Sequence, residues 1–222
     1  MASRFLIHET SEKTIETNVL ADISNWIHYH WHRQVTIISP TQRQEPNLGF
    51  DDIVEGLPPG ITRVLQFKRP YSYDSRRLSN FAKFIIDTSQ LQVLLGHFNP
   101  GEAYYVFVPL PTTNEVIRNR PNLLRIGAAL DVYNVPNATK TTQRTRIARV
   151  AKSSLAPSVE IADPREFESA NAKSLKEWCA SLDRDFFKRF KDESRKKRGS
   201  LKIRNIYFIH ISEERFHFEE FF

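Results

Sequence analysis

The segment AYYVFVPL at 103–110 constrains the fold most, because it is apolar at almost every position. Half-exposed strands alternate apolar and polar side chains, whereas a nearly continuous apolar strand is typical of a sheet buried on both faces. We therefore expect 103–110 to be a strand that other elements cover on both sides. The chain is 40% hydrophobic, which is enough for a core of this kind.

Periodicity upstream of this strand predicts the elements that precede it. Apolar residues spaced three and four apart predict an amphipathic helix over 12–28, with Ser11 and Glu12 at its start. Strands are predicted at 34–39, 49–54 and 61–67, the last two being joined by a turn rich in glycine and proline. Helices are predicted over 76–86 and 89–98. The resulting order is helix, three strands, helix, strand.

The second half of the chain carries weaker signals. A helix is expected within 114–130, and 135–146 is polar and typical of turns. A helix that becomes strongly basic is predicted over 171–198, and a strand over 202–211. Because no flexible Gly/Ser linker is present, we expect residues 1–112 to form a core and 113–222 an α+β extension packed on it.

Charge and cysteine content limit the function classes. Lysine and arginine number 32 against 26 acidic residues, a net charge of +6 that favours a polyanionic partner. The single cysteine, Cys179, excludes an intramolecular disulfide and a cysteine zinc cluster, and we expect it to be a buried small hydrophobe. The N-terminus lacks a secretory h-region, and no apolar run approaches the ~20 residues of a membrane span. A soluble, cytoplasmic protein is expected.

The hairpin 49–68 places polar side chains where packing alone would favour apolar ones. Side chains alternate along a strand, so Gln66 and Lys68 share one face while Phe67 takes the other. Asp51 and Asp52 point to opposite faces, and only one of them can join that polar group. A carboxylate, an oxygen donor and a lysine on adjacent strands are what metal-dependent phosphodiester hydrolysis requires. The alternative interpretation is a cross-strand surface ion pair.

At these residues the chain resembles the PD-(D/E)xK nuclease superfamily. That family has an α-β-β-β-α-β core, the order predicted above, and the resemblance implies an α/β, restriction-endonuclease-like central mixed sheet flanked by helices. It also implies that Asp51 is the principal acid that binds Mg²⁺ or Mn²⁺. Gln66-Phe67-Lys68 matches the (D/E)xK segment, with the Gln66 side chain and the Phe67 backbone carbonyl as ligands and Lys68 as the water-positioning group. Glu16 matches the glutamate of the first helix, a second ligand or water-organiser.

The family resemblance implies a nuclease acting on nucleic acid, with DNA as the expected polymer and restriction, defence, mobile-element control or repair as possible settings. Gln66 departs from the family acid, which removes one negative charge and leaves open a non-cleaving protein that binds nucleic acid. A protein-interaction module is the other alternative, because the C-terminus is rich in phenylalanine. Cutting both strands of a duplex would favour a homodimer or a partner subunit.

Basic residues near the hairpin and in the C-terminal part are candidates for phosphate contacts. They are Arg69, Arg76, Arg77, Lys188, Arg195, Lys196, Lys197 and Arg198. A solvated helix face explains the C-terminal run equally well. His28, His30 and His32 would share a face if extended, but we interpret them as histidines at a helix end rather than as zinc ligands.

Overall fold

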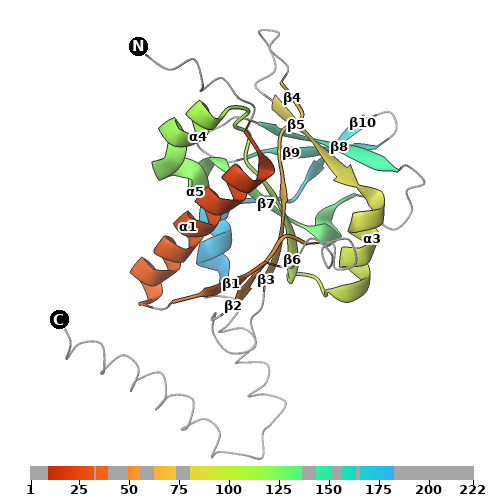
Figure 1. Cartoon of the computed structure of the whole chain (residues 1–222). Coiled ribbons are helices and arrows are strands. Elements are labelled where there is room, and N and C mark those ends of the chain that lie inside the picture. The colour runs from red at the N-terminus through yellow and green to blue at the C-terminus, as the bar shows by residue number, and fades with distance from the viewer. Residues whose placement is uncertain are drawn as a thin grey trace, which may run out of the picture. The chain divides into compact units, whose positions relative to one another are not determined.

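The computed structural model describes residues 10–32, 34–39, 50–55, 63–73, 81–136, 144–151, 157–163 and 166–182. Residues 1–182 form one compact unit and residues 183–222 a second, which lies outside the described residues. The described part is a mixed α/β structure that contains two sheets and flanking helices (Figure 1). Among the described residues, no helix is both long and apolar enough to cross a membrane.

The first sheet has six strands in the order β1-β2-β3-β6-β7-β11. The strands are β1 (Thr36–Ile38), β2 (Asp52–Glu55), β3 (Arg63–Lys68), β6 (Ala103–Phe107), β7 (Ala128–Asp131) and β11 (Lys173–Ser174). All neighbouring pairs are antiparallel except β3 and β6, which run parallel. The sheet is therefore mixed, as predicted. Strand β6 occupies the first five residues of the predicted strand 103–110 and lies near the centre of the sheet.

The second sheet has five strands in the order β10-β9-β8-β5-β4, all antiparallel. The strands are β4 (Ser72–Tyr73), β5 (Phe81–Asp87), β8 (Thr145–Ala151), β9 (Val159–Asp163) and β10 (Glu166–Ala170). Its longest pairing joins β5 to β8 over seven residue pairs, from Phe81↔Ala151 to Asp87↔Thr145. Residues beyond 112 thus contribute strands to both sheets.

Helix α1 (Glu12–Trp31) confirms the predicted amphipathic helix and extends three residues beyond it. Ser11 caps its N-terminus by accepting a hydrogen bond from the Thr14 N–H, which satisfies one of the free donors there. Its buried stripe consists of Ile15, Glu16, Val19, Leu20, Ile23 and Ile27. Glu16 is the one acidic residue in that stripe, so the helix places a carboxyl group against the interior.

The remaining helices are short. Helix α3 (Thr88–His97) confirms the predicted helix at 89–98, and the Asp87 side chain caps it by accepting from the Ser89 and Gln90 N–H groups. Helices α4 (Thr113–Asn119) and α5 (Leu123–Ile126) confirm a helix within 114–130, and are separated by the 3₁₀ turn η2 (Arg120–Asn122). A second turn, η3 (Val132–Asn134), follows β7, and residues 175–182 are helical.

The six-stranded sheet is covered on both faces, as the apolar β6 predicts. Val64, Tyr105 and Phe107 point to one face, where they join residues of α3 and of the second sheet in the main core. Leu65 and Tyr104 point to the other face, where the Tyr104 ring lies 5.7 Å from the Trp178 ring of the 175–182 helix. Figure 1 shows α1 and this helix on one side of the sheet and α3 on the other.

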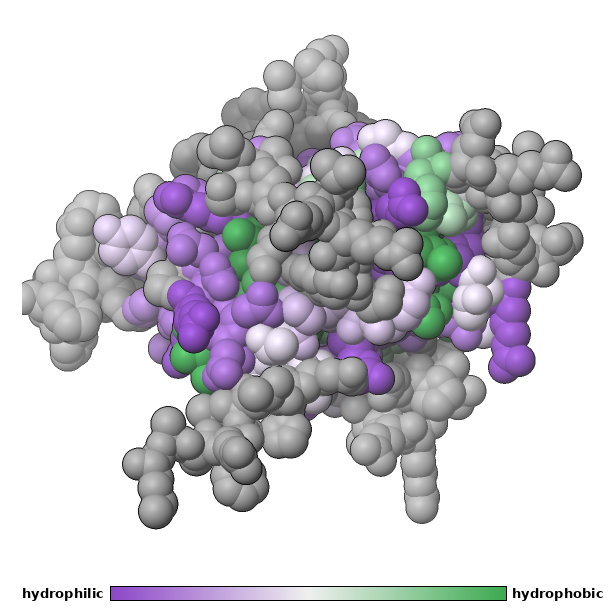
Figure 2. All heavy atoms as spheres, turned by 90° about the horizontal axis from the view of Figure 1, so that it is seen from above, coloured by the Kyte–Doolittle hydropathy of each residue, from purple (hydrophilic) through white to green (hydrophobic). Residues whose placement is uncertain are grey.

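The surface seen from above is mostly hydrophilic in the described part, with small hydrophobic groups between polar ones (Figure 2). The exposed large hydrophobic side chains lie on separate elements, for example Tyr29 on α1, Ile85 on β5 and Ile117 on α4. Scattered exposed apolar residues are normal for globular proteins. Cys179 is fully buried, as expected, and burial raises the pKa of its thiol to about 12.

Three sequence predictions need correction or fall outside the described part. The helix predicted over 76–86 is wrong at 81–86, which belong to strand β5, while 74–80 lie outside the described residues. The helix predicted from 171 begins at 175, after strand β11. The continuation of that helix beyond 182 and the strand at 202–211 lie outside the described residues.

Candidate functional site

Asp51 stands immediately before β2, where the hydrogen-bond ladder with β3 ends. Its backbone N–H donates to the Leu65 carbonyl at 3.1 Å. Its side chain then takes the position of the next ladder acceptor, since Oδ2 accepts from the Phe67 N–H at 2.6 Å and from Gln66 Nε2 at 2.7 Å. The Asp51 carboxylate is therefore fixed against the backbone of β3 by two short hydrogen bonds.

The Gln66 side chain lies at the centre of this group and is 1% exposed. Besides donating to Asp51, its Nε2 lies 3.1 Å from the carbonyl oxygen of Phe67. Its Oε1 accepts from Gln90 Nε2 at 2.8 Å, so α3 holds the other end of the amide. The Asp51 carboxylate and the Phe67 carbonyl oxygen thus both face Gln66 Nε2. These are three of the residues expected to bind a cation, but Gln66 presents its nitrogen to the other two rather than its oxygen.

Gln90 is a residue of the site that sequence reasoning missed. It lies in the first turn of α3, 24 residues after Gln66, and its side-chain Oε1 is buried without a hydrogen-bond partner among the described residues. A glutamine early in a helix is common and carries no signal by itself. Only the packing of α3 against the face of β3 that bears Gln66 brings the two amides together.

The carboxyl groups of Glu16 and Asp52 form a pair on the face of the sheet opposite to Gln66. Asp52 pairs with Leu65 across the β2–β3 ladder, so it points towards α1, and it is fully buried. The Ser39 hydroxyl donates to its Oδ1. Burial raises the pKa of Glu16, and the neighbouring Asp52 raises it further through its charge and a side-chain hydrogen bond. Because Asp52 is fully buried, the alternative of an exposed ion pair is excluded for this residue.

Lys13 brings a positive charge to these carboxylates. Its Nζ forms an ion pair with Glu16 Oε1, one helical turn away on α1. The hydrogen bond to Glu16 is the main cause that raises the pKa of Lys13, and the charges of Asp52 and Asp51 raise it further. Both aspartates therefore lie within electrostatic range of one ammonium group. The i,i+3 spacing of Lys13 and Glu16 on one helix is the sequence signal for this ion pair.

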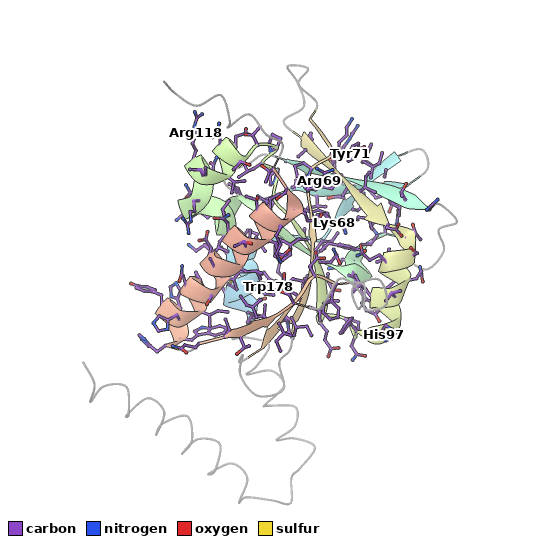
Figure 3. All side chains as sticks on the ribbon, viewed as in Figure 1. Lys68, Arg69, Tyr71, His97, Arg118 and Trp178 are labelled. Carbon is purple, nitrogen blue, oxygen red and sulfur yellow. The ribbon has the colours of Figure 1, made fainter. Side chains whose placement is uncertain are left out.

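Lys68 is the last residue of β3 and is half-buried. It pairs with Phe107 two positions after the Gln66–Tyr105 pair, so it belongs to the same sheet face as Gln66. Arg69 follows and is exposed, and its backbone N–H donates to Glu12 Oε2 at 3.0 Å. Figure 3 shows Lys68, Arg69 and Tyr71 following one another at the end of β3 where the chain leaves the sheet.

The remaining candidate residues divide into two groups. Arg76, Arg77, Lys188, Arg195, Lys196, Lys197 and Arg198 lie outside the described residues. His28 and His30 lie in the last turn of α1, and His32 caps it with a φ of 51°. Since this segment is helical rather than extended, the three histidines do not share a face, which agrees with the interpretation of a helix end.

The donor atoms around Gln66 suit a hard divalent cation. Mg²⁺ prefers carboxylate, carbonyl and amide oxygens, and Asp51, Phe67 and Gln66 carry these three kinds. Within the described part of the chain, no three His, Cys, Asp or Glu side chains are grouped as metal ligands. A site here would therefore depend on backbone and amide oxygens in addition to carboxylates. The residues fit the cation by donor chemistry, provided that Gln66 presents oxygen rather than nitrogen.

Comparison of the chain with models of protein families, with curated proteins and with solved structures found no significant match. The functional assignment therefore depends on the geometry around Asp51 and Gln66. It also depends on the elements that position them, α1, β1, β2, β3, α3 and β6, with a parallel β3–β6 pair. The expected order of helix, three strands, helix and strand is interrupted, because β4 and β5 of the second sheet lie between β3 and α3.

Proposed function

We propose that this protein is a metal-dependent nuclease of the PD-(D/E)xK type that hydrolyses phosphodiester bonds, with DNA as its substrate. The observation that carries the proposal is the convergence of the Asp51 carboxylate, the Gln66 side chain and the Phe67 carbonyl at the end of the β2–β3 hairpin. The order of helix and strands around this point and the net charge of +6 support it.

In the proposed mechanism, Mg²⁺ or Mn²⁺ would be held by Asp51, the Phe67 carbonyl and the Gln66 amide oxygen. When bound, the ion would polarise the phosphoryl group and lower the pKa of a coordinated water. Lys68 would orient the attacking water and offset the charge that develops on the phosphate. Arg69, exposed at the exit of β3, would contact a flanking phosphate and so position the strand.

The Glu16–Asp52 pair has a distinct role in this proposal. Two neighbouring carboxyl groups in a buried setting ionise less readily than isolated ones, and the raised pKa of Glu16 follows from this arrangement. Glu16 would organise water on the α1 side of the sheet. It would not share the ion held by Asp51, Phe67 and Gln66, because it lies with Asp52 on the opposite face. The ammonium group of Lys13 would offset part of the negative charge of Glu16 and Asp52, because an unpaired buried charge is costly.

Cleavage of supercoiled plasmid, linear duplex and single-stranded DNA in Mg²⁺, Mn²⁺ or EDTA tests the proposal. Metal-dependent cleavage by the wild type is expected, with a loss of at least ~100-fold in Lys68→Ala, the lower range for removing one electrostatic group from an active site. Lys83→Ala is the matched control, since Lys83 is also half-buried but lies on β5. Equal activity in all three proteins would refute the assigned site.

A catalytically silent protein that binds nucleic acid is the second candidate, and the orientation of Gln66 favours it. Gln66 Nε2, a donor, occupies the point on which the two oxygens converge. This candidate predicts DNA binding that weakens as salt rises, with no cleavage in any divalent metal. A filter-binding titration at several salt concentrations, run beside the cleavage assay, separates the two functions.

A further inference from the structure

The amides of Gln66 and Gln90 form a pair whose present orientation opposes cation binding. Gln66 Nε2 donates to Asp51 Oδ2 and lies 3.1 Å from the Phe67 carbonyl, while Gln66 Oε1 accepts from Gln90 Nε2. An NH₂ group carries partial positive charge and has no lone pair to offer a metal ion. A cation beside Asp51 and Phe67 would therefore require the oxygen of Gln66 on that side.

Gln90 makes the opposite orientation possible. Its Oε1 is buried and has no hydrogen-bond partner among the described residues. Gln90 therefore carries an acceptor that could take a hydrogen bond from the Gln66 amide if the Gln90 amide turned. If both amides turn by half a rotation, Gln66 Nε2 donates to Gln90 Oε1, and Gln66 Oε1 faces Asp51 and Phe67. One amide–amide hydrogen bond is present before and after the change. Side-chain amide torsions are broad and roughly two-fold, and oxygen and NH₂ are similar in size, so the packing is kept.

We infer that the Gln66–Gln90 pair is a two-position element that turns to admit a divalent cation, with Gln90 as a positioning residue for Gln66. The inference rests on the proposed function, because it places the cation beside Asp51. Without the ion, the Gln66 NH₂ group satisfies the Asp51 carboxylate and the Phe67 carbonyl. With the ion, these two oxygens and Gln66 Oε1 bind it, and Gln90 accepts the displaced NH₂ group.

The rotation has a thermodynamic consequence. A ligand that binds the less populated of two states has an apparent affinity reduced by that state's population. A change that favours the turned orientation therefore strengthens metal binding without touching the metal. Gln90→Glu is such a change, because an ionised carboxylate accepts from Gln66 Nε2 and repels Gln66 Oε1. An acidic residue also suits the first turn of α3, so this variant should fold.

The test measures Mn²⁺ binding to the full chain by calorimetry at neutral pH. Gln90→Glu is expected to bind Mn²⁺ at least about tenfold more tightly than Gln92→Glu, an equal charge on an exposed position of α3. In a Gln66→Glu background the gain should vanish, since a carboxylate offers oxygen in both orientations and two acids then face each other. Mg²⁺ should shift the side-chain amide NMR signals of Gln66 and Gln90 together and leave Gln92 unchanged.

The outcomes separate this inference from the proposed function. Equal Mn²⁺ affinities in Gln90→Glu and Gln92→Glu, or a gain that persists with Gln66→Glu, would overturn the two-position element even if the protein cleaves DNA. If the Mn²⁺ affinities follow the expected order but no DNA is cleaved in Mg²⁺ or Mn²⁺, the two-position element is supported and the nuclease function is rejected. No Mn²⁺ binding by the wild type or by Gln66→Glu would reject the cation site and the inference with it.

Discussion

Replacing Asp51 by alanine should destabilise the protein through two hydrogen bonds. The carboxylate accepts from the Phe67 N–H at 2.6 Å and from Gln66 Nε2 at 2.7 Å, and both donor residues are buried. Hydrogen bonds to charged groups contribute about 1.5–3 kcal/mol each. Because Asp51 itself is half-buried, water can replace part of the loss, and we expect about 3 kcal/mol. For a protein of this size, that corresponds to a fall in Tm of roughly 6–12 °C.

Urea denaturation of the wild type, Asp51→Ala and Asp51→Asn measures this effect. Asn keeps one side-chain oxygen, so its loss of stability should be about half that of alanine, although it removes the charge that a metal would need. Glu12→Ala is the control, because Glu12 accepts one backbone N–H, from Arg69, at an exposed site and should lose about 1 kcal/mol or less. An Asp51→Ala protein within 1 kcal/mol of the wild type would refute the structural role of the carboxylate.

Three further variants test the interior. The raised pKa of Glu16 means that the folded protein holds this proton more tightly than the unfolded chain, so stability falls as pH rises from 4.5 through the folded pKa; Glu16→Gln should flatten that fall in urea titrations. The buried Tyr105 hydroxyl has no hydrogen-bond partner among the described residues, so Tyr105→Phe should be neutral or stabilise by about 1 kcal/mol, and a larger loss would contradict this. A Cβ at Gly127 would collide with the Leu175 side chain, so Gly127→Ala should cost about 1–3 kcal/mol in thermal unfolding.

Local patterns predicted the strands β1, β2, β3 and β6 of the first sheet, but not its strands β7 and β11 or the strands of the second sheet. The helix at 12–28 and the strands around 61–67 and 103–110 have one clear period or an uninterrupted apolar run. Strand β5 has neither a clear period nor an uninterrupted apolar run. Phe81 and Ile85 are apolar although they lie on its less buried face, so its apolar residues also fit the three- and four-residue spacing of a helix. Its partner β8 begins 58 residues after β5 ends, and pairing at that distance leaves no mark in a local window.

The candidate site shows the same limit at the level of single side chains. Alternation correctly placed Asp51 and Asp52 on different sides, but which of them faces α1 depends on the register of the hairpin. A slip of one residue exchanges the two faces, and composition does not fix it. The register pairs Asp52 with Leu65, so Asp52 meets Glu16, while Asp51 binds to the backbone of β3. Gln90 required the packing of a helix that the motif does not include.

The neutral amide of Gln66 suits its buried position beside the Asp51 carboxylate. A carboxylate at this position would lie beside the Asp51 carboxylate, and two such charges would repel each other in a buried setting. The amide instead donates to Asp51 and accepts from Gln90 Nε2, so the Asp51 carboxylate and the NH₂ group of Gln90 each have a hydrogen-bond partner. Glutamine in place of an acidic residue at position 66 also lowers the attraction for a cation, because one negative charge is absent. In the proposed site, the neutral amide would thus both stabilise the fold and weaken cation binding, and the orientation of the Gln90 amide would determine how tightly the cation binds.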